Sequence, residues 1–155
     1  MTAADTASQL LHFEDFHAGQ MFAFGRYEVS REEIVEFAKE FDPQPHHLDD
    51  DAGKRSLLGG LAASGWHVCA MAMRMVVDGL IVKAANRGGV GADECRWMKP
   101  VRPGDILRVE VEVLETRAST SRSDIGFVHV ACRIFNQREQ VALLAMTPIL
   151  ARRRA

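Results

Sequence analysis

The second half of the chain alternates between apolar and polar residues with a period of two. Within residues 105–115, every second position from 107 to 113 is apolar and the positions between these are charged. The apolar positions are Leu107, Val109, Val111 and Val113, and the charged ones are Arg108, Glu110 and Glu112. Because side chains two residues apart share one face of a strand, this pattern predicts a half-buried strand.

Four other segments have strand character: residues 21–29, 90–97, 125–135 and 140–150. Asn136–Glu139 is expected to form a turn between the last two segments, and Pro100–Asp105 a turn after the second. The strands of the second half follow one another with short connections, which favours antiparallel pairing.

Helical periodicity marks two other regions. Residues 31–41 follow the sequence Ser30-Arg31-Glu32-Glu33, which has the form of a capping box, and Pro43 is expected to end this helix. A longer helix is expected over about Leu61–Ala84, with a length of roughly 36 Å at 1.5 Å per residue.

In this long helix the apolar residues at three- and four-residue spacing form one stripe, and a second stripe is more polar. The apolar stripe is Trp66, Cys69, Met73, Val76 and Leu80, and the polar stripe is Ser64, His67, Met71, Arg74 and Asp78. The order of elements predicts an α+β domain in which one long helix lies across an antiparallel sheet.

Composition and charge exclude only a few classes of function. The chain has 155 residues and a net charge of −2, with 47% hydrophobic and 26% charged residues, as in ordinary globular domains. No basic stripe with interleaved aromatic residues suggests nucleic acid, and Arg152–Arg154 is most simply a solvated tail. His67, Arg74 and three glycines interrupt the apolar stretch 56–77, which indicates a buried helix rather than a membrane span.

The cysteines and the N-terminus indicate a cytoplasmic protein. Cys69, Cys95 and Cys132 are odd in number and form no CxxC pair, so neither a disulfide framework nor a structural zinc site is expected. The first ten residues have no basic segment followed by an apolar one, unlike a secretion signal.

The stretch FDPQPHHLD, residues 41–49, concentrates chemically active side chains between two prolines. A bent loop can bring Asp42 and His47 toward one point, where a carboxylate and an imidazole are a competent pair for activating water. The amide of Gln44 can anchor the loop. Alternative interpretations are that Asp42 forms a turn and that Asp49 caps a short helical turn over 50–54. The adjacent His46 and His47 could also bind a metal, although no third ligand is evident in the sequence.

The start of the long helix, Ala62-Ala63-Ser64-Gly65-Trp66, is the second candidate element. Free backbone N–H groups in a first helical turn stabilise negative charge, and a glycine there lets a ligand approach the backbone. These amides could polarise the carbonyl of a thioester as charge develops on its oxygen. Close helix packing is the alternative reason for such small residues.

Together these elements resemble the MaoC-like dehydratases, a family that includes the (R)-specific enoyl-CoA hydratases. The family signature D-x-N-P-x-H-x-D is similar to Asp42–Asp49, and the family's helix start is similar to 61–66, with Gly65 in the glycine position. Lys99–Asp105 matches the family's turn into its central strands. The resemblance covers about residues 13–150, with a flexible lead-in at 1–12 and a basic tail at 151–155.

The resemblance implies a hotdog fold, a homodimer or a larger assembly of dimers, and an acyl-CoA substrate, with no metal and no cofactor. Asp42 and His47 would be the catalytic dyad and the Gly65 amide the oxyanion donor, while Gln44, Ser64 and Trp66 would contact the substrate. The implied reaction is reversible addition of water across the 2,3-double bond of an enoyl thioester, which yields a (3R)-hydroxyacyl thioester.

Three positions depart from the family pattern. Gln44 replaces an asparagine, Ser64 replaces a common histidine, and Met73 stands where some hydratases carry a serine that supports the dyad. Two other functions therefore stay open: an acyl-CoA thioesterase of the same fold, and a non-catalytic subunit that binds acyl-CoA.

Overall fold

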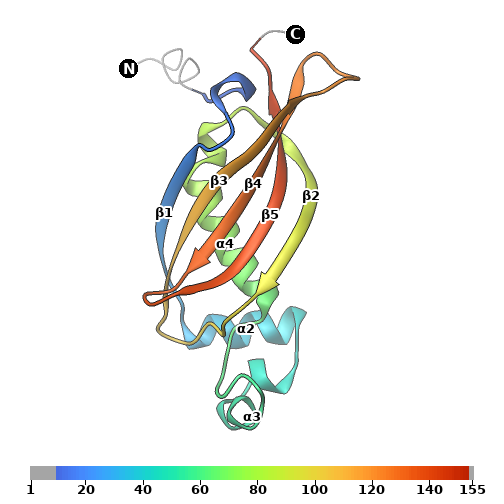
Figure 1. Ribbon diagram of the computed structural model, residues 1–155. Helices are drawn as coiled ribbons and strands as arrows, with labels where there is room; N and C mark the ends of the chain where they lie inside the picture. Colours follow the sequence, from blue (N-terminus) through green and yellow to red (C-terminus); the bar gives the residue numbers. More distant parts are fainter. Residues whose placement is uncertain (1–9, 154–155) are drawn as a thin grey trace, which may run out of the picture.

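The computed structural model describes residues 10–153 as an antiparallel sheet with one long helix packed against a face of it (Figure 1). Five strands pair in the order β1-β3-β4-β5-β2. They are β1 (Met21–Glu28), β2 (Asn86–Trp97), β3 (Ile106–Ala118), β4 (Ile125–Phe135) and β5 (Gln140–Ala151). The predicted α+β class and all five predicted strands are confirmed.

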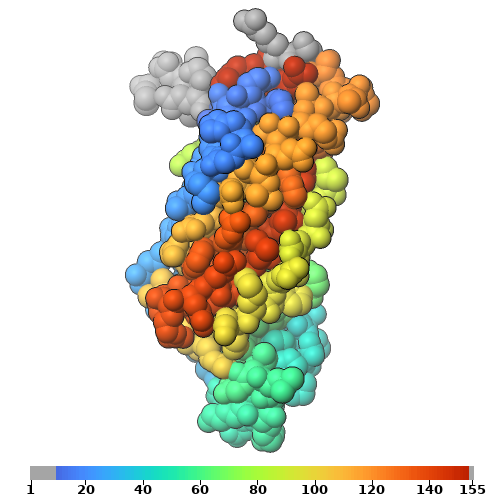
Figure 2. Space-filling view, in the orientation of Figure 1, coloured from blue at the N-terminus to red at the C-terminus, as the bar shows by residue number. Residues whose placement is uncertain are grey.

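The alternation of β3 gives one face to the core and one to solvent. Leu107, Val109, Val111 and Val113 are fully buried. On the other face the Arg108 guanidinium donates to Glu110. Figure 2 looks onto this outer face of the sheet, and the segment containing α2 and α3 lies below the lower end of the sheet.

Strand β2 begins at Asn86, four residues before the predicted start at Val90. Gly88 and Gly91 have φ values of 117° and 154°, a backbone region that only glycine enters readily, and the pairing of β2 with β5 shifts register nearby. Because glycines have no side chain, this part of the strand shows no alternation of apolar and polar residues, and its start could not be predicted from the sequence. β2 is an edge strand of the sheet, and most of its residues are exposed.

The short helices begin where the sequence predicts. In α2 (Arg31–Phe41) the Ser30 hydroxyl accepts from the Glu33 amide at 3.1 Å, which is the serine half of the expected box. In α3 (Asp50–Arg55) the Asp49 carboxylate accepts from the Ala52 amide at 2.9 Å, as the capping interpretation predicts. Within residues 10–153, three short 3-10 turns complete the helical elements: η1 (Phe13–Asp15), η2 (Pro45–His47) and η3 (Ile81–Lys83).

The long helix is shorter than predicted. Helix α4 spans Gly65–Gly79 and is followed by η3, so the predicted start at Leu61 is wrong. Residues 61–64 are outside the helix, and the Ala63 amide donates to the Val101 carbonyl at 2.9 Å. A contact with a segment almost forty residues away thus fixes where the helix starts.

The predicted division of the long helix into an apolar and a polar stripe is confirmed only in part. Val76 and Leu80 are buried and Arg74 and Asp78 are exposed, as predicted, but other positions are wrong. Trp66 and Met73 of the apolar stripe are 61% and 37% exposed, whereas His67 and Met71 of the polar stripe are buried. The buried face consists of His67, Val68, Met71, Ala72, Met75 and Val76. By length and composition Gly65–Lys83 would also suit a membrane span, but a core helix passes the same test, and this one packs on the sheet.

The two ends of the described chain lie together at the end of the molecule opposite α3 (Figure 1). The amide of Arg153 donates to Glu14, and its guanidinium donates to Asp15 at 2.9 Å. This part of the basic tail is therefore paired rather than simply solvated. Most of the predicted lead-in, residues 1–9, lies outside the described residues, as do Arg154 and Ala155.

Candidate active site

A cavity of about 760 Å³ opens at the N-terminal end of α4, between that helix, the loop after α2 and the end of β2. Five of the six residues singled out from the sequence line it. They are Asp42, Gln44, His47, Gly65 and Trp66. The structure thus brings the proline loop and the helix start to one chamber.

The carboxylate of Asp42 is held at both oxygens. The Ser64 hydroxyl donates to Oδ2 at 2.6 Å, and the side-chain amide of Gln44 donates to Oδ1 at 2.7 Å. These hydrogen bonds, that from Ser64 first, lower the pKa of Asp42 below its ordinary value. Asp42 is therefore a carboxylate at neutral pH and can only accept hydrogen bonds.

The imidazole of His47 is buried and fixed in one orientation. Its Nδ1 lies 2.7 Å from the carbonyl oxygen of Ala62, and because a carbonyl only accepts, Nδ1 carries the hydrogen. Its Nε2 lies 3.5 Å from Asp42 Oδ2. In the neutral ring, Nε2 then has a free lone pair that faces the carboxylate and the cavity.

The local sequence explains how Asp42 and His47 meet. The Asp42 amide closes the last turn of α2 on the Ala38 carbonyl. The backbone amide of Gln44 then donates to the backbone carbonyl of Asp42 at 2.7 Å, and Pro45 starts η2. This 3-10 turn reverses the chain, so a five-residue spacing brings two side chains together that a strand would separate.

The start of α4 forms the opposite wall of the cavity. Gly65 is the first helical residue, and the amides of the first turn have no partner within the helix. The indole of Trp97 lies against Gly65 so closely that a Cβ on the glycine would be 2.2 Å from the ring. The rings of Trp66 and Trp97 meet edge to face with centroids 5.0 Å apart.

Ser64 is the one predicted substrate contact that does not line the cavity. It is fully buried behind Asp42, to which its hydroxyl donates. The sequence suggested a serine facing the substrate, whereas the structure places it where it holds the carboxylate.

Several wall residues were not identified from the sequence. The rest of the lining is mostly apolar and includes Phe41, Leu57, Trp97 and Met98, while His46, Ser56 and Lys99 add polar groups. Strand β2 ends at Trp97, and Met98 follows it immediately before Lys99-Pro100. Two large apolar residues at such a position were a signal that could have been used. Leu57 and Leu58 come from an irregular segment with no periodicity to read.

The two adjacent histidines do not converge on one point. The rings of His46 and His47 meet edge to face with centroids 4.3 Å apart, and both nitrogens of His47 are directed at protein oxygens. Among residues 10–153 no group of three or more histidine, cysteine or acidic side chains is placed to hold a metal ion.

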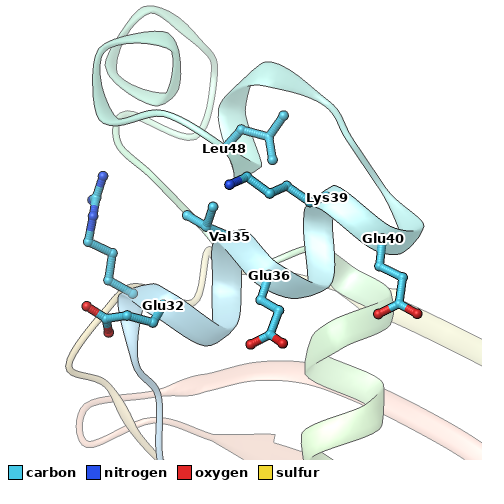
Figure 3. Close-up of a pocket in the computed structure, with 7 residues that line it drawn as sticks. Glu32, Val35, Glu36, Lys39, Glu40 and Leu48 are labelled. Atoms are coloured by element: carbon cyan, nitrogen blue, oxygen red, sulfur yellow. The ribbon is translucent and has the colours of Figure 1, made fainter.

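A second hollow, of about 560 Å³, follows the surface of α2 (Figure 3). It contains none of the six predicted site residues. Glu36 and Glu40 project from one side of α2, away from Leu48 (Figure 3). The hollow therefore lacks the paired imidazole and carboxylate of the larger cavity.

Residues 15–130 match the family described as MaoC like domain. A MaoC-like dehydratase from Rhodospirillum rubrum superposes with a TM-score of 0.88 at 42% identity, over 94% of this chain and 99% of that one. The protein YdeM of Bacillus subtilis is 30% identical over 83% of this chain and 90% of its own length.

A third relative is a hydratase by its name. The R-hydratase PhaJ1 from Pseudomonas aeruginosa, in unliganded form, superposes with a TM-score of 0.70 at 25% identity. The match covers 92% of this chain and 86% of that one. The likeness to these structures confirms the expected hotdog fold.

Proposed function

Because the chain belongs to the MaoC-like domain family, we propose that it is a hydro-lyase that adds water reversibly to a 2,3-enoyl thioester of coenzyme A. The reaction needs a base near C3, a proton donor for C2, and a donor that stabilises charge on the thioester oxygen. The dyad of Asp42 and His47 and the backbone amide of Gly65 supply these groups from opposite walls of one cavity.

We assign Asp42 and His47 to the handling of water. A water molecule between Oδ2 and Nε2 would donate a hydrogen bond to each acceptor, which directs its lone pairs into the cavity. As the oxygen bonds to C3, Nε2 takes a proton, and the carboxylate stabilises the imidazolium that forms. The imidazolium then returns a proton to C2, so one water molecule is added and the enzyme is unchanged.

The Gly65 amide has the complementary role. When the C2–C3 π electrons move toward C2, negative charge develops on the thioester oxygen as an enolate. An N–H group at the positive end of α4 stabilises this charge more than that of the ground-state carbonyl, and this difference accelerates the reaction. Gln44 holds the carboxylate, and the indole of Trp66 forms part of the wall beside the acyl group.

We further propose that two copies form the working unit. The edge strand β2 and the neighbouring face of α4 carry exposed apolar side chains, including Met73, Val90 and Trp97. A hollow of about 450 Å³ between Met73, Val77 and the start of β2 belongs to the same surface. A second copy would cover this surface and narrow the open side of the cavity.

The observation that carries the proposal is the fixed state of His47. Its Nδ1 is bound to the Ala62 carbonyl, which leaves Nε2 as an acceptor 3.5 Å from the Asp42 carboxylate, inside the cavity that Gly65 borders. If Asp42 served only to form a turn, it would not need the buried imidazole of His47 beside it or the buried hydroxyl of Ser64 as a hydrogen-bond donor.

The test is turnover of crotonyl-CoA and of a panel of longer and branched enoyl-CoAs. Loss of the absorbance of the conjugated thioester without release of free thiol is expected, with formation of the 3-hydroxyacyl product. Release of free thiol would instead identify a thioesterase. Binding without either change, over the whole panel, would identify an acyl-CoA-binding subunit.

The variants Asp42→Asn and His47→Ala test the assigned roles. Each is expected to lower kcat by at least about a thousandfold, since each removes a group that contacts water in the transition state. Far-UV circular dichroism and the thermal midpoint check that the fold is kept. Near-normal turnover by either variant would contradict the assignment of the dyad.

A further inference from the structure

Arg102 does not line the cavity, yet its guanidinium binds the segment that leads into α4. Nη1 donates to the Leu61 carbonyl at 3.3 Å, and Nη2 donates to the Leu58 carbonyl. These partners are more than forty residues away in the sequence. A planar guanidinium can reach two carbonyls at once, which a lysine cannot do with a fixed geometry.

The same segment carries the group that orients His47. The Ala62 carbonyl accepts from His47 Nδ1, and the Ala62 amide donates to the His46 carbonyl at 3.4 Å. On the other side the Ala63 amide donates to the Val101 carbonyl. Residues 58–63 therefore lie between the dyad loop and the turn that carries Arg102.

The turn that carries Arg102 is itself fixed. The carboxylate of Asp105, which is only 3% exposed, accepts from the Arg102 amide at 2.9 Å and from the Gln137 side chain at 3.0 Å. Gly104 has a φ of 87°, which closes this turn. The base of the arginine is therefore held by a buried carboxylate rather than by solvent.

The path of the guanidinium to the two carbonyls depends on a glycine. A Cβ on Gly60 would lie 2.7 Å from Arg102 Nη1, and a Cβ on Gly53 would lie 2.4 Å from the carbonyl carbon of Gly60. The backbone of α3, the segment 58–63 and the arginine are thus packed in direct succession, without space for a side chain between them.

We propose that Arg102 is a positioning residue for the dyad, an inference that rests on the proposed hydratase function. By holding the carbonyls of Leu58 and Leu61 it fixes the backbone that leads directly into Ala62, and with it the position of the Ala62 carbonyl. That carbonyl determines which nitrogen of His47 carries the hydrogen and where Nε2 points. Arg102 therefore acts on the reaction through the backbone, without contact with substrate.

The test compares Arg102→Lys and Arg102→Ala with the matched control Arg108→Lys, a strand arginine whose guanidinium donates to Glu110 on the outer face of the sheet. We expect kcat for crotonyl-CoA to fall about tenfold to a hundredfold in both Arg102 variants, because small misplacements of a catalytic group are that costly. KM is expected to change less than threefold, and millimolar guanidinium is expected to restore part of the activity of Arg102→Ala. The control should keep wild-type kcat and show no response to guanidinium.

A second measurement does not depend on activity. The side-chain ¹⁵N shifts of the histidines report which ring nitrogen carries the hydrogen, and the missing signal in His47→Gln identifies His47. The wild type is expected to show hydrogen on Nδ1, and Arg102→Ala a mixture of both forms. If the wild type hydrates no enoyl-CoA, the proposed function fails, but this comparison still decides the role of Arg102.

Unchanged kcat together with an unchanged His47 form in Arg102→Ala would overturn the inference. If Arg102→Ala does not fold, Arg102→Lys and Gly60→Ala replace it. The added methyl of Gly60→Ala displaces the guanidinium while the arginine is kept, so both variants should show the loss in kcat and the mixed histidine signal. If neither shows them, the inference is equally overturned.

Discussion

The two ends of α4 use the same packing device in different surroundings. The helix begins with Gly65 and ends with Gly79, and each glycine lies directly under an aromatic ring. A Cβ would be 2.2 Å from the ring of Trp97 at the first end and 2.2 Å from the ring of Phe24 at the second. In both places the glycine allows a ring to lie on the helix backbone.

The two ends of α4 differ in the groups that surround them. The first faces a cavity of about 760 Å³ with a carboxylate, an imidazole and free helix amides. Near the second, a space of only about 20 Å³ is enclosed by apolar side chains, among them Phe16, Val76 and Leu80. A tightly packed glycine is therefore not by itself a sign of catalysis. The polar groups that face it decide its role.

Substitution of the two glycines by alanine gives the largest expected contrast. In Gly65→Ala the methyl displaces the indole of Trp97 and stands between the first amides and the substrate, so kcat/KM should fall about a hundredfold. In Gly79→Ala the methyl displaces the ring of Phe24, which packs against the core, so the free energy of unfolding should fall by about 1–3 kcal/mol. Hydration kinetics and urea unfolding measure the two effects.

Each glycine variant is the control for the other. Gly79→Ala should keep kcat/KM within about twofold, because the C-terminal end of the helix lies far from the cavity. Gly65→Ala should lose little stability, since Trp97 is half exposed and can turn outward. Equal loss of activity in both variants would mean that the two ends do not differ in the way described.

The variant Ser64→Ala tests the polar groups at the first end of α4. It removes the strongest donor to Asp42, so kcat at neutral pH should fall about tenfold, as expected when one hydrogen bond to a charged group is lost. Because the hydrogen bonds of the wild type lower the pKa of Asp42, their partial loss raises it. Activity should therefore be lost at a higher pH as the solution is acidified, and pH profiles of kcat measure this shift.

Ser119→Ala is the matched control for this variant, since the Ser119 hydroxyl accepts from the Arg122 amide in the exposed turn between β3 and β4. Its pH profile should coincide with that of the wild type. A Ser64→Ala profile with only a uniform loss of rate would indicate that the serine stabilises the fold without controlling the charge of Asp42.

The elements that were predicted correctly depend on local sequence. Ser30 and Asp49 cap helices through amides three residues away, and β3 shows its alternation within one strand. The proline loop is equally local, which is why Asp42 and His47 could be paired before their distance was known.

The wrong predictions concern segments whose conformation is determined by contacts with residues distant in the sequence. Residues 61–64 were predicted to be helical because nothing in their local sequence interrupts a helix, but Val101 and Arg102 hold this segment in a different conformation. Helix α4 is apolar on most of its surface, so periodicity alone did not show which face would be buried. The side of Asp42 that Ser64 occupies follows only from this tertiary arrangement.

His67 lies half a turn into α4 from the first end and gives the smallest expected effect. It is only 6% exposed and its ring stacks on Phe37, with centroids 4.6 Å apart. Burial lowers its pKa, against a weaker opposite influence of Glu33. Below the ordinary histidine pKa of about 6.5 the unfolded chain therefore binds a proton that the folded chain does not, so stability is lost as the pH falls, by at most about 1.4 kcal/mol per pH unit.

The variant His67→Phe should lack this pH-dependent loss of stability. Urea unfolding at pH 8.0, 6.5 and 5.5 should show its free energy of unfolding rising relative to that of the wild type as the pH falls, while kcat/KM at pH 8.0 is kept. A difference in unfolding free energy that stays constant across the three pH values would mean that His67 takes up its proton equally well in the folded chain, and that the polar environment of the first end of α4 extends to this residue.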